Sequence, residues 1–419
     1  MANTLLVPNQ IARGALAILH NNLRFTRTVS RQYDDSFAKT GAKIGDTIRI
    51  RLPNQYNTST GAALSIQDTT NRVIALTIGT NTLGTPSAAP GLGSVLTGTG
   101  NQRHVDVNFT TLELSLSVDE FMRLIGEPAM SVLASMIDYD VMSAVVPYVN
   151  NLVGTPGTTP ATAAVLLQSH AKLNYHAAPM TPRYFAADPT ANAALVDGMK
   201  GLFNPNSNVS QQFREGLMAD NQLGFREMYM SQSVPVITTG ARNAAYLTNT
   251  PAGITNGDIT LAVDTGANAM TAGDVFTVAG VHSVNPETKQ STGQLYQFAV
   301  RAAYAGGAGN VPIWPALYKT GPLQNISTDV PDNTALTFVG TASTAYPNNL
   351  AYHRDAFAFA SVDLVMPEGV DQSAREVMDG ISMRYVRQYR IGTDDIPARF
   401  DVAYGGVCAR PEMACRVIG

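Results

Sequence analysis

The 419-residue chain has few charged side chains, and this shortage separates it from ordinary soluble domains. Charged residues make up 14% of the sequence, against roughly 25% in an average soluble protein. We expect a chain so poor in charge to bury much of its surface against other subunits, although secreted β-rich proteins show the same deficit. The 45% of apolar residues excludes a disordered chain, and the length predicts two or three domains.

Cysteine is almost absent, which excludes a disulfide-stabilised fold. The two cysteines, Cys408 and Cys415, would point to opposite faces of a shared strand, so neither a disulfide framework nor a metal site is expected. The start of the chain, MANTLLVPNQ, lacks the basic segment of a secretory signal, and no apolar run reaches the roughly 18 residues of a membrane span. We therefore expect a protein made in a reducing cytoplasm, with no membrane partner.

Positive charge is also scarce, and arginine carries most of it. The net charge is −4, and six of the 28 basic residues are lysine. This balance gives no electrostatic footprint for tight nucleic-acid binding. Arginine is favoured at protein interfaces, but a GC-rich coding sequence would raise the arginine content equally well.

Recognisable catalytic motifs are missing from the sequence. His353-Arg354-Asp355 resembles a kinase catalytic loop, yet the asparagine required five residues after the Asp is replaced by Ala360. The six histidines lack HExxH or CxxC companions, and no GxSxG, Walker or GxGxxG pattern occurs. We therefore predict no enzyme activity, no cofactor and no metal ion.

Residues 8–23 have the pattern of an amphipathic helix. Apolar residues at helical spacing, among them Leu16, Leu19 and Leu23, form one stripe. A helix of this length cannot bury the stripe alone, so it docks either on its own chain or on a neighbour. We take Leu16, Leu19 and Leu23 as candidates for a subunit interface.

Apolar and polar residues alternate over 44–52, which predicts a strand with an apolar face and a cationic face that carries Arg49 and Arg51. The stretch 53–104 that follows is rich in Gly, Thr, Asn, Ser and Pro. It is too long for an ordinary connection in a compact domain, so we predict a projecting β-loop. Arg49 and Arg51, at the base of this loop, are further interface candidates.

A strand over 105–109 is predicted to return from the loop and to lead into a long helix. Ser117 and Glu120 have the spacing of a capping box, and apolar residues then recur at helical spacing as far as Val149. Pro128 should kink or divide this helix. A helix of about thirty residues exceeds the usual length and needs a long partner surface, such as a sheet.

The amino-acid composition changes twice in the remainder of the chain. Residues 155–240 indicate a mixed α/β region, whereas 238–344 is dense in Gly, Thr, Asn and Ala and contains short strand patterns separated by turns. This composition, with its short strand patterns, predicts a small all-β barrel or sandwich inserted between α/β segments. Alternation over 381–386 predicts a further strand, so the whole chain is expected to be α+β.

The order of these pieces, together with several local stretches, resembles the coat proteins of short-tailed phages. MANTLLVPNQIARGALAILHNNLRFTRTVSRQYDD is similar to the arm at the start of that family, and GAKIGDTIRIRLP to the start of its extended loop. VDVNFTTLELSLSVDEFMRLIGEPAMSVLASMIDYDVM resembles the return strand and spine helix, and GDVFTVAGVHSVNPETKQSTGQLYQFAV resembles a telokin-like insertion domain. NLAYHRDAFAFASVDLVMPEG and DIPARFDVAYGGVCARPEMACRVIG are similar to the final strands.

The resemblance implies the tailed-phage and herpesvirus capsid fold with an inserted β-barrel. The implied parts are an N-terminal arm (1–40), an extended loop (41–112), a peripheral domain with a spine helix (113–155), an axial domain (156–237), an inserted β-domain (238–344), an axial return (345–375) and C-terminal peripheral strands (376–419). It also implies hexamers and pentamers of an icosahedral shell around double-stranded DNA, bound without sequence specificity. A scaffolding protein, a portal, a procapsid that expands on packaging, and a location in the virion after synthesis in the host cytoplasm complete the expectation.

Three other functions remain open from the sequence. A secreted or surface β-rich protein, such as an adhesin or an S-layer subunit, would share the low charge. A hydrolase with an unrecognised site is a second alternative. A cargo-enclosing compartment made by a cell would have the same fold as a phage capsid.

Overall fold

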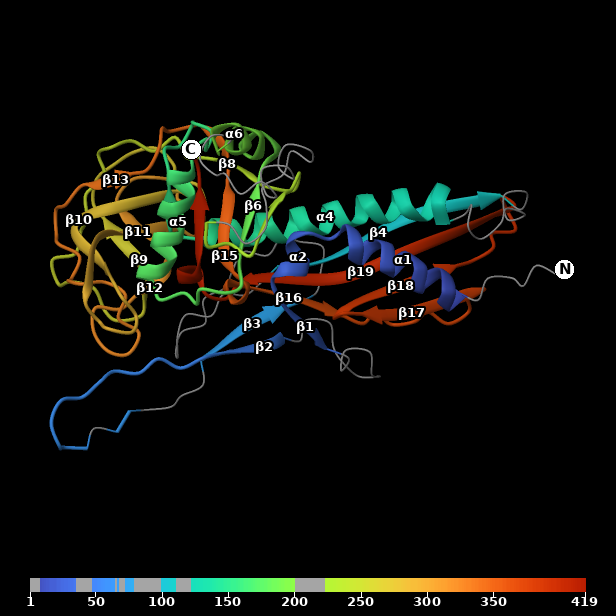
Figure 1. Ribbon diagram of the computed structural model, residues 1–419, viewed down its shortest axis with the longest axis horizontal. Coiled ribbons are helices and arrows are strands. Elements are labelled where there is room, and N and C mark those ends of the chain that lie inside the picture. The colour runs from blue at the N-terminus through green and yellow to red at the C-terminus, as the bar shows by residue number, and fades with distance from the viewer. Residues whose placement is uncertain are drawn as a thin grey trace.

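The computed structural model describes residues 8–34, 47–64, 66–67, 72–78, 99–110, 122–199 and 223–419. Figure 1 shows an elongated molecule with a rounded part at one end and a long arm of strands and helices at the other. A loop projects from the junction between these two parts. The predicted α+β composition is confirmed.

A six-stranded sheet forms the long arm. In sheet order its strands are β1 (Ser30–Asp34), β16 (Phe357–Val362), β19 (Asp395–Cys408), β18 (Ile381–Arg387) and β17 (Gln372–Met378), and β4 (Thr99–Thr110) pairs with the other side of β19. The strand predicted over 105–109 is therefore part of β4, and its partner is β19 near the C-terminus rather than the strand at the base of the loop. This pairing joins residues from Asp395 with Thr110 to Gly406 with Thr99, which are about 300 positions apart, and local alternation does not encode it.

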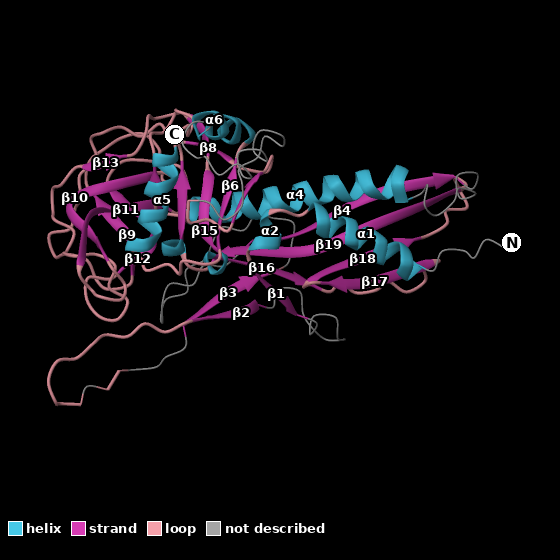
Figure 2. Cartoon of the chain, in the orientation of Figure 1, coloured by secondary structure: helices cyan, strands magenta, loops and turns pink. Residues whose placement is uncertain are grey.

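Helices cover one face of this sheet (Figure 2). They are α1 (Pro8–Asn22), the short α2 (Phe25–Thr28) and α4 (Glu127–Val145), with a π-helical turn η3 (Met122–Gly126) before α4 and a 3-10 turn η4 (Val146–Tyr148) after it. Pro128 lies in the first turn of α4, where the π-helical turn gives way to α-helix. Helical residues run without a break from Met122 to Tyr148, so the proline marks a change of helix type and does not divide the helix. Ser117 and Glu120 lie outside the described residues.

β16 is buried on both faces, because a second layer covers the side of the sheet opposite the helices. Phe357 and Phe359 join the core with α1 and α4, whereas Ala358 and Ala360 face a separate apolar cluster. That cluster is completed by the apolar side chains of a two-stranded ribbon, β2 (Thr47–Leu52) and β3 (Arg72–Thr77). The small alanine side chains let the ribbon approach the sheet closely.

The rounded part contains a second sheet and two helices. The sheet order is β5 (Leu152–Val153), β20 (Ala414–Val417), β15 (Asn349–His353), β6 (Arg183–Ala187) and β7 (Glu227–Met230), and the helices are α5 (Ala163–Tyr175) and α6 (Pro189–Met199). The C-terminal β20 contributes to its middle, between β5 and β15. The two ends of the chain therefore stabilise different parts of the molecule.

Residues between β8 (Val236–Thr238) and β14 (Ala345–Pro347) form an antiparallel sheet with its own apolar core. Its strand order is β13 (Leu336–Phe338), β10 (Val275–Val284), β11 (Ser291–Val300), β12 (Gly309–Leu317) and β9 (Asp258–Val263). Leu247 forms a β-bridge with Ala335, next to β13, and Thr248 forms one with Val263 of β9. One segment thus contacts both edges of the sheet. β8 and β14 pair with each other, which places the two ends of this region side by side.

Two predicted boundaries differ from the observed sheet membership. β16, within the range 345–375 expected to return to the axial domain, is a central strand of the long sheet. β20, within the range 376–419 expected to remain peripheral, pairs with β15 in the rounded part. The 3-10 turn η6 (Pro411–Met413) redirects the chain between β19 and β20. Because β20 and the second half of β19 are buried throughout, no change of alternation marks the turn.

The two cysteines lie in different sheets and are both free and buried, Cys408 at the end of β19 and Cys415 in β20. Burial raises the pKa of the Cys408 thiol well above its ordinary value and that of Cys415 to about 12. Both thiols are therefore protonated and unreactive at neutral pH.

One helical segment of the described chain, Leu124–Tyr148, is long and apolar enough to span a membrane by length and composition alone. Of its most apolar window, 56% is buried inside the chain. Met130, Leu133 and Ile137 belong to the main core, which is the burial pattern of a core helix.

Candidate assembly interface

Arg49 and Arg51 lie on the outer face of the ribbon formed by β2 and β3. Arg49 is opposite Ala75 and Arg51 is opposite Val73 in the register, and Ile50 between them is 8% exposed. Both arginines are exposed, and neither has an ion pair with any residue that the structure describes. The predicted strand with one apolar and one cationic face is confirmed.

The loop beyond the ribbon exposes large apolar side chains. Tyr56 is 53% exposed, Leu64 is 86% exposed and Ile66 is 85% exposed. In Figure 1 the loop continues to the left from β2 and β3 and projects beneath the rounded part. Isolated exposed apolar residues are ordinary, but here three on one projecting loop are left uncovered by the described residues of the chain.

A side-chain amide joins the two limbs of this loop. The Asn57 backbone N–H donates to Gln67 Oε1 at 2.7 Å, and Gln67 Nε2 donates to the Asn57 carbonyl at 2.6 Å. The Gln67 amide thus forms the pair of hydrogen bonds that a neighbouring strand would form. Here the loop keeps its two limbs together without an apolar core of its own.

Leu16, Leu19 and Leu23 are buried within their own chain. Their exposed fractions are 1%, 0% and 0%, and they belong to the core that α1 shares with α4 and the long sheet. Of the two alternatives for the amphipathic helix, docking on its own chain is therefore the correct one. The three leucines leave no exposed area for a neighbouring subunit, because α4 and β17 flank α1 along its length.

Asp138 on α4 fixes the segment that follows α1. Its carboxylate accepts hydrogen bonds from the backbone N–H groups of Arg24 (2.7 Å), Phe25 (3.1 Å) and Thr26 (3.0 Å), and from the Thr26 hydroxyl (2.9 Å). These backbone groups open α2 and have no partner inside that helix. A residue more than a hundred positions away thus caps α2 and connects the arm to α4.

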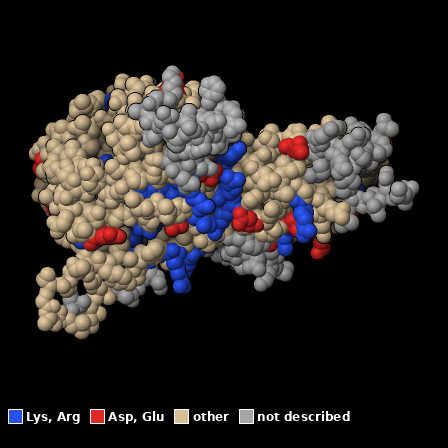
Figure 3. All heavy atoms as spheres, viewed as in Figure 1, with Lys and Arg blue, Asp and Glu red and all other residues tan. Residues whose placement is uncertain are grey.

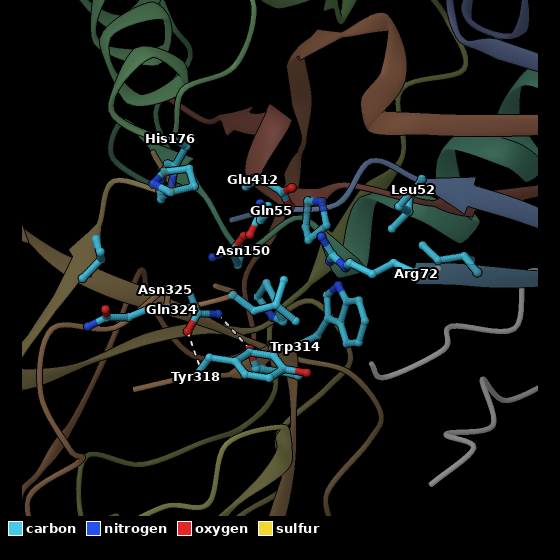
Figure 4. A pocket seen from close by; sticks show the side chains of 18 of the residues that line it. Leu52, Gln55, Arg72, Asn150, His176, Trp314, Tyr318, Gln324, Asn325 and Glu412 are labelled. Carbon is cyan, nitrogen blue, oxygen red and sulfur yellow. Dashed lines mark hydrogen bonds between the residues drawn. The ribbon is translucent and has the colours of Figure 1, made fainter. Parts of the chain in front are cut away.

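A cavity of about 120 Å³ lies where the ribbon, the 238–344 region and η6 meet (Figure 4). Trp314 of β12 is 5% exposed and packs in the same apolar cluster as the ribbon, so it joins the two parts. Asn325 crosses the floor of the cavity: its Nδ2 donates to the Ala316 carbonyl at 2.7 Å and its Oδ1 accepts from the Tyr318 N–H at 2.9 Å.

The cavity lacks the chemistry of an active site. Burial and the neighbouring Lys172 lower the pKa of His176 to about 4, so this imidazole is neutral at pH 7. Glu412 accepts from Arg410 Nε at 3.1 Å, which leaves it a poor general base. Among the described residues, no group of three or more His, Cys, Asp or Glu side chains could hold a metal ion.

A family model described as "P22 coat protein - gene protein 5" matches residues 16–419, which is nearly the whole chain. The chain belongs to the P22 coat protein family. It is the major capsid protein of a tailed phage, a non-enzymatic subunit of the icosahedral shell of the virion. The resemblance found in the sequence is thereby confirmed, and the hydrolase, the surface protein and the cellular compartment are set aside.

Solved phage capsids resemble the coat protein over most of its length at low identity. A chain of Mycobacterium phage Che8 is 12% identical, with a TM-score of 0.43, over 94% of this chain and 90% of that chain. The capsid of cyanophage P-SCSP1u is 9% identical (TM-score 0.40, 94% and 87%), and the mature capsid of bacteriophage PhiM1 is 11% identical (TM-score 0.40, 94% and 86%). No curated protein matches. The assignment rests on the family match, because structural likenesses this weak carry no argument.

For a coat protein, sequence reasoning named Arg49 and Arg51 as interface candidates, which stay a prediction, and did not single out the exposed apolar residues of the projecting loop. Tyr56, Leu64 and Ile66 could have been found as the large apolar side chains within an otherwise polar, uncharged stretch. Asp138 was missed as well. An acidic residue on the buried side of a helical pattern is the signal that would have indicated it.

Proposed function

We propose that this coat protein assembles as hexamers and pentamers on a scaffolding protein, with a portal at one vertex, into a procapsid that expands as double-stranded DNA enters. The observation that carries the proposal is the projecting loop, whose Leu64 and Ile66 are 86% and 85% exposed. Subunits that associate permanently bury about 2,000–5,000 Å² per interface. A loop directed away from its own body supplies such area only to a neighbour.

In this proposal each part of the molecule has the role that the sequence resemblance implies. The segment containing β2, β3 and the loop is the extended loop, and α1 with α2 forms the N-terminal arm. The long sheet with α4 is the peripheral domain, and the second sheet with α5 and α6 is the axial domain. For β16 and β20 the proposal follows the sheets to which they belong, so the proposed peripheral domain includes β16 and the proposed axial domain includes β20.

We assign 238–344 as an inserted β-barrel domain that folds by itself. Its own core includes stacked Phe276 and Phe298, with ring centroids 5.1 Å apart, and its ends leave through the paired strands β8 and β14. Expressed alone, residues 238–344 should show β-type circular dichroism and a cooperative melt. A random-coil spectrum would contradict the assignment.

Arg49 and Arg51 are assigned to the contact between subunits. The competing interpretation is that they protect an exposed strand from unwanted pairing, as charges often do. Replacing both by alanine should impair shell formation and leave the melting of the subunit nearly unchanged. Normal shells from this variant would favour protection of the strand.

The central test is the assembly state of the expressed protein. Negative-stain electron microscopy and sedimentation, with and without a scaffolding protein, should show closed shells or capsomers. A single species at 44.5 kDa under every condition would contradict the proposal. Detection of a single portal vertex in these shells would test the portal of the proposal.

A further inference from the structure

Four exposed arginines lie close together although they come from separate segments: Arg24, Arg27, Arg226 and Arg354, here called the arginine patch. Figure 3 shows Lys and Arg gathered over α2 and the adjoining border of the rounded part. Arg27 Nη2 lies 3.2 Å from Glu227 Oε1, which places α2 against the start of β7.

Backbone hydrogen bonds bring the other two arginines to the same place. The Arg226 N–H donates to the Arg183 carbonyl at 2.7 Å, and the Arg354 N–H donates to the Pro182 carbonyl at 3.4 Å. Residues 226 and 354 therefore flank the start of β6. Burial lowers the pKa of Arg31 beside them, and the positive charges of Arg27 and Arg354 lower it further.

The arginine patch is not neutralised by the described part of the chain. Arg27 pairs with Glu227, Asp355 is next to Arg354, and the neighbouring Arg31 pairs with Asp379, so five positive charges face three negative ones among these described residues. Elsewhere arginines have close acidic partners, including Arg103 with Asp140, Arg384 with Asp401 and Arg399 with Asp106. A local positive excess on a chain of net charge −4 indicates an anionic partner outside the subunit.

The arrangement suits an extended polyanion better than a small anion or a protein. Arg24 and Arg226 directly precede α2 and β7, Arg27 lies in α2, and Arg354 begins η5 (Arg354–Ala356). None of the four lines the cavity described above. Arginine occurs at protein interfaces too, but there it accompanies Trp and Tyr anchors, and the arginine patch has no aromatic member. Guanidinium groups bind phosphate oxygens in pairs of hydrogen bonds, and a patch with no aromatic member has nothing to stack on a base.

We infer that the arginine patch contacts the phosphate backbone of the packaged duplex, without reading its sequence. The inference rests on the proposed function, because a shell filled with DNA supplies the polyanion. It also refines the sequence-based expectation: a net negative chain without a global footprint for nucleic acid can still hold DNA weakly at one defined place.

The salt dependence of DNA binding gives the expected size of the effect. Each phosphate neutralised contributes about 0.9 to the slope of log affinity against log salt concentration. Four arginines therefore predict a slope of roughly −3.6 and a loss of roughly 100-fold in affinity between about 50 and 200 mM salt. Removing three of them should lower the slope by about 2 to 3.

The test uses the full-length subunit and a fluorescent duplex of random sequence, with anisotropy measured across a salt series. The variant carries Arg24→Gln, Arg226→Gln and Arg354→Gln. A matched control carries Arg13→Gln, Arg390→Gln and Arg399→Gln, which removes the same charge outside the patch. A third variant, with lysine at 24, 226 and 354, preserves the charge and should retain most of the slope.

The expected result is a loss of slope in the glutamine variant of the patch, with little change in the control and in the lysine variant. Equal slopes in wild type and patch variant would overturn the inference. Binding of polyglutamate is measured in the same proteins. If the glutamine variant of the patch lost polyglutamate binding but kept its DNA binding, the partner would be an acidic protein and the inference would be overturned. Shell formation, scored separately by electron microscopy, distinguishes failure of this inference from failure of the proposed function.

Discussion

The helix α1 and the projecting loop look alike in the sequence, since each carries apolar residues that it cannot bury alone. In the folded chain their apolar side chains differ in exposure: Leu19 is 0% exposed, whereas Leu64 is 86% exposed. α1 lies against α4 and β17 of its own chain, while the loop extends away from any such surface (Figure 1). Whether such an apolar segment is buried in its own chain depends on whether that chain offers a surface to cover it. A local sequence pattern does not show this.

This difference separates two kinds of stabilisation. Apolar area buried by α1 contributes to the stability of the single subunit, whereas area on the loop contributes only after assembly. Substitutions in α1 and in the loop test this difference. Changes at the arm should lower the free energy of unfolding of the subunit, and changes at the loop should leave it unaltered.

The largest effect on the subunit is expected from Asp138→Ala. This substitution leaves three backbone N–H donors and the Thr26 hydroxyl without their acceptor in a buried site. Each unsatisfied buried donor costs about 1–3 kcal/mol, and some relaxation is expected, so the free energy of unfolding should fall by about 4 kcal/mol. Urea denaturation measures it, with Ser131→Ala on the exposed side of α4 as the control. A change as small as that of the control would show that α2 is not held by this carboxylate.

A somewhat smaller loss is expected from Leu19→Ala. The leucine is fully buried between α1 and the rest of the core, and truncation of such a side chain costs about 2–5 kcal/mol. We expect about 3 kcal/mol, measured by the same denaturation. Asn21→Ala, at an exposed position of the same helix, should change little. If Leu19→Ala left stability intact but abolished shells, the arm would belong to the interface after all.

The next effect is a loss of stability in acid that depends on His176. Burial and Lys172 lower the pKa of this group to about 4, whereas the unfolded chain binds a proton at about pH 6.5. The unfolded state therefore takes up the proton first, and stability is lost as the pH falls from about 6.5 towards 4. At about pH 5 the loss should be about 2 kcal/mol relative to about pH 7.5.

Comparison of wild type with His176→Gln isolates this contribution, because the remaining histidines titrate in both proteins. Thermal melting at the two pH values should show a smaller acid loss in the variant. Identical pH dependence in the two proteins would mean that His176 is solvated and titrates normally.

Sequence reasoning found the elements whose pattern is local. The helix at 8–23 and the strand at 381–386 appear in the structure within one residue at each end. The strand predicted over 44–52 appears as β2, which is described from Thr47 to Leu52. Pro128 was expected to kink or divide the long helix, because proline lacks the N–H that a helix interior requires. The structure instead changes from π-helix to α-helix next to the proline and continues.

Long-range pairings could not be predicted in the same way. β4 pairs with β19 and β20 pairs with β15, and both pairings join distant segments whose partners are not marked by alternation. Burial on both faces removes the alternating signal from β16. The arginine patch was hidden for the same reason, since Arg24, Arg226 and Arg354 are unrelated in sequence and meet only in the fold.

The smallest effect on the subunit, and the sharpest contrast with the arm, is expected from Leu64→Ser combined with Ile66→Ser. Both side chains are exposed by more than four fifths, at 86% and 85%, and exposed substitutions usually change stability by less than about 0.5 kcal/mol. Assembly should nevertheless fall by at least about tenfold, because a small loss per contact is repeated in every subunit of the shell.

Sedimentation and electron microscopy of the assembled fraction, together with urea denaturation of the free subunit, test this double variant. Thr58→Ser with Thr60→Ser, on the same exposed loop, is the matched control and should assemble normally. Normal shells from the Leu64 and Ile66 variant would remove the loop from the interface. A loss of subunit stability comparable to that of Leu19→Ala would instead show that the loop folds back onto its own chain in solution, and the distinction between arm and loop would disappear.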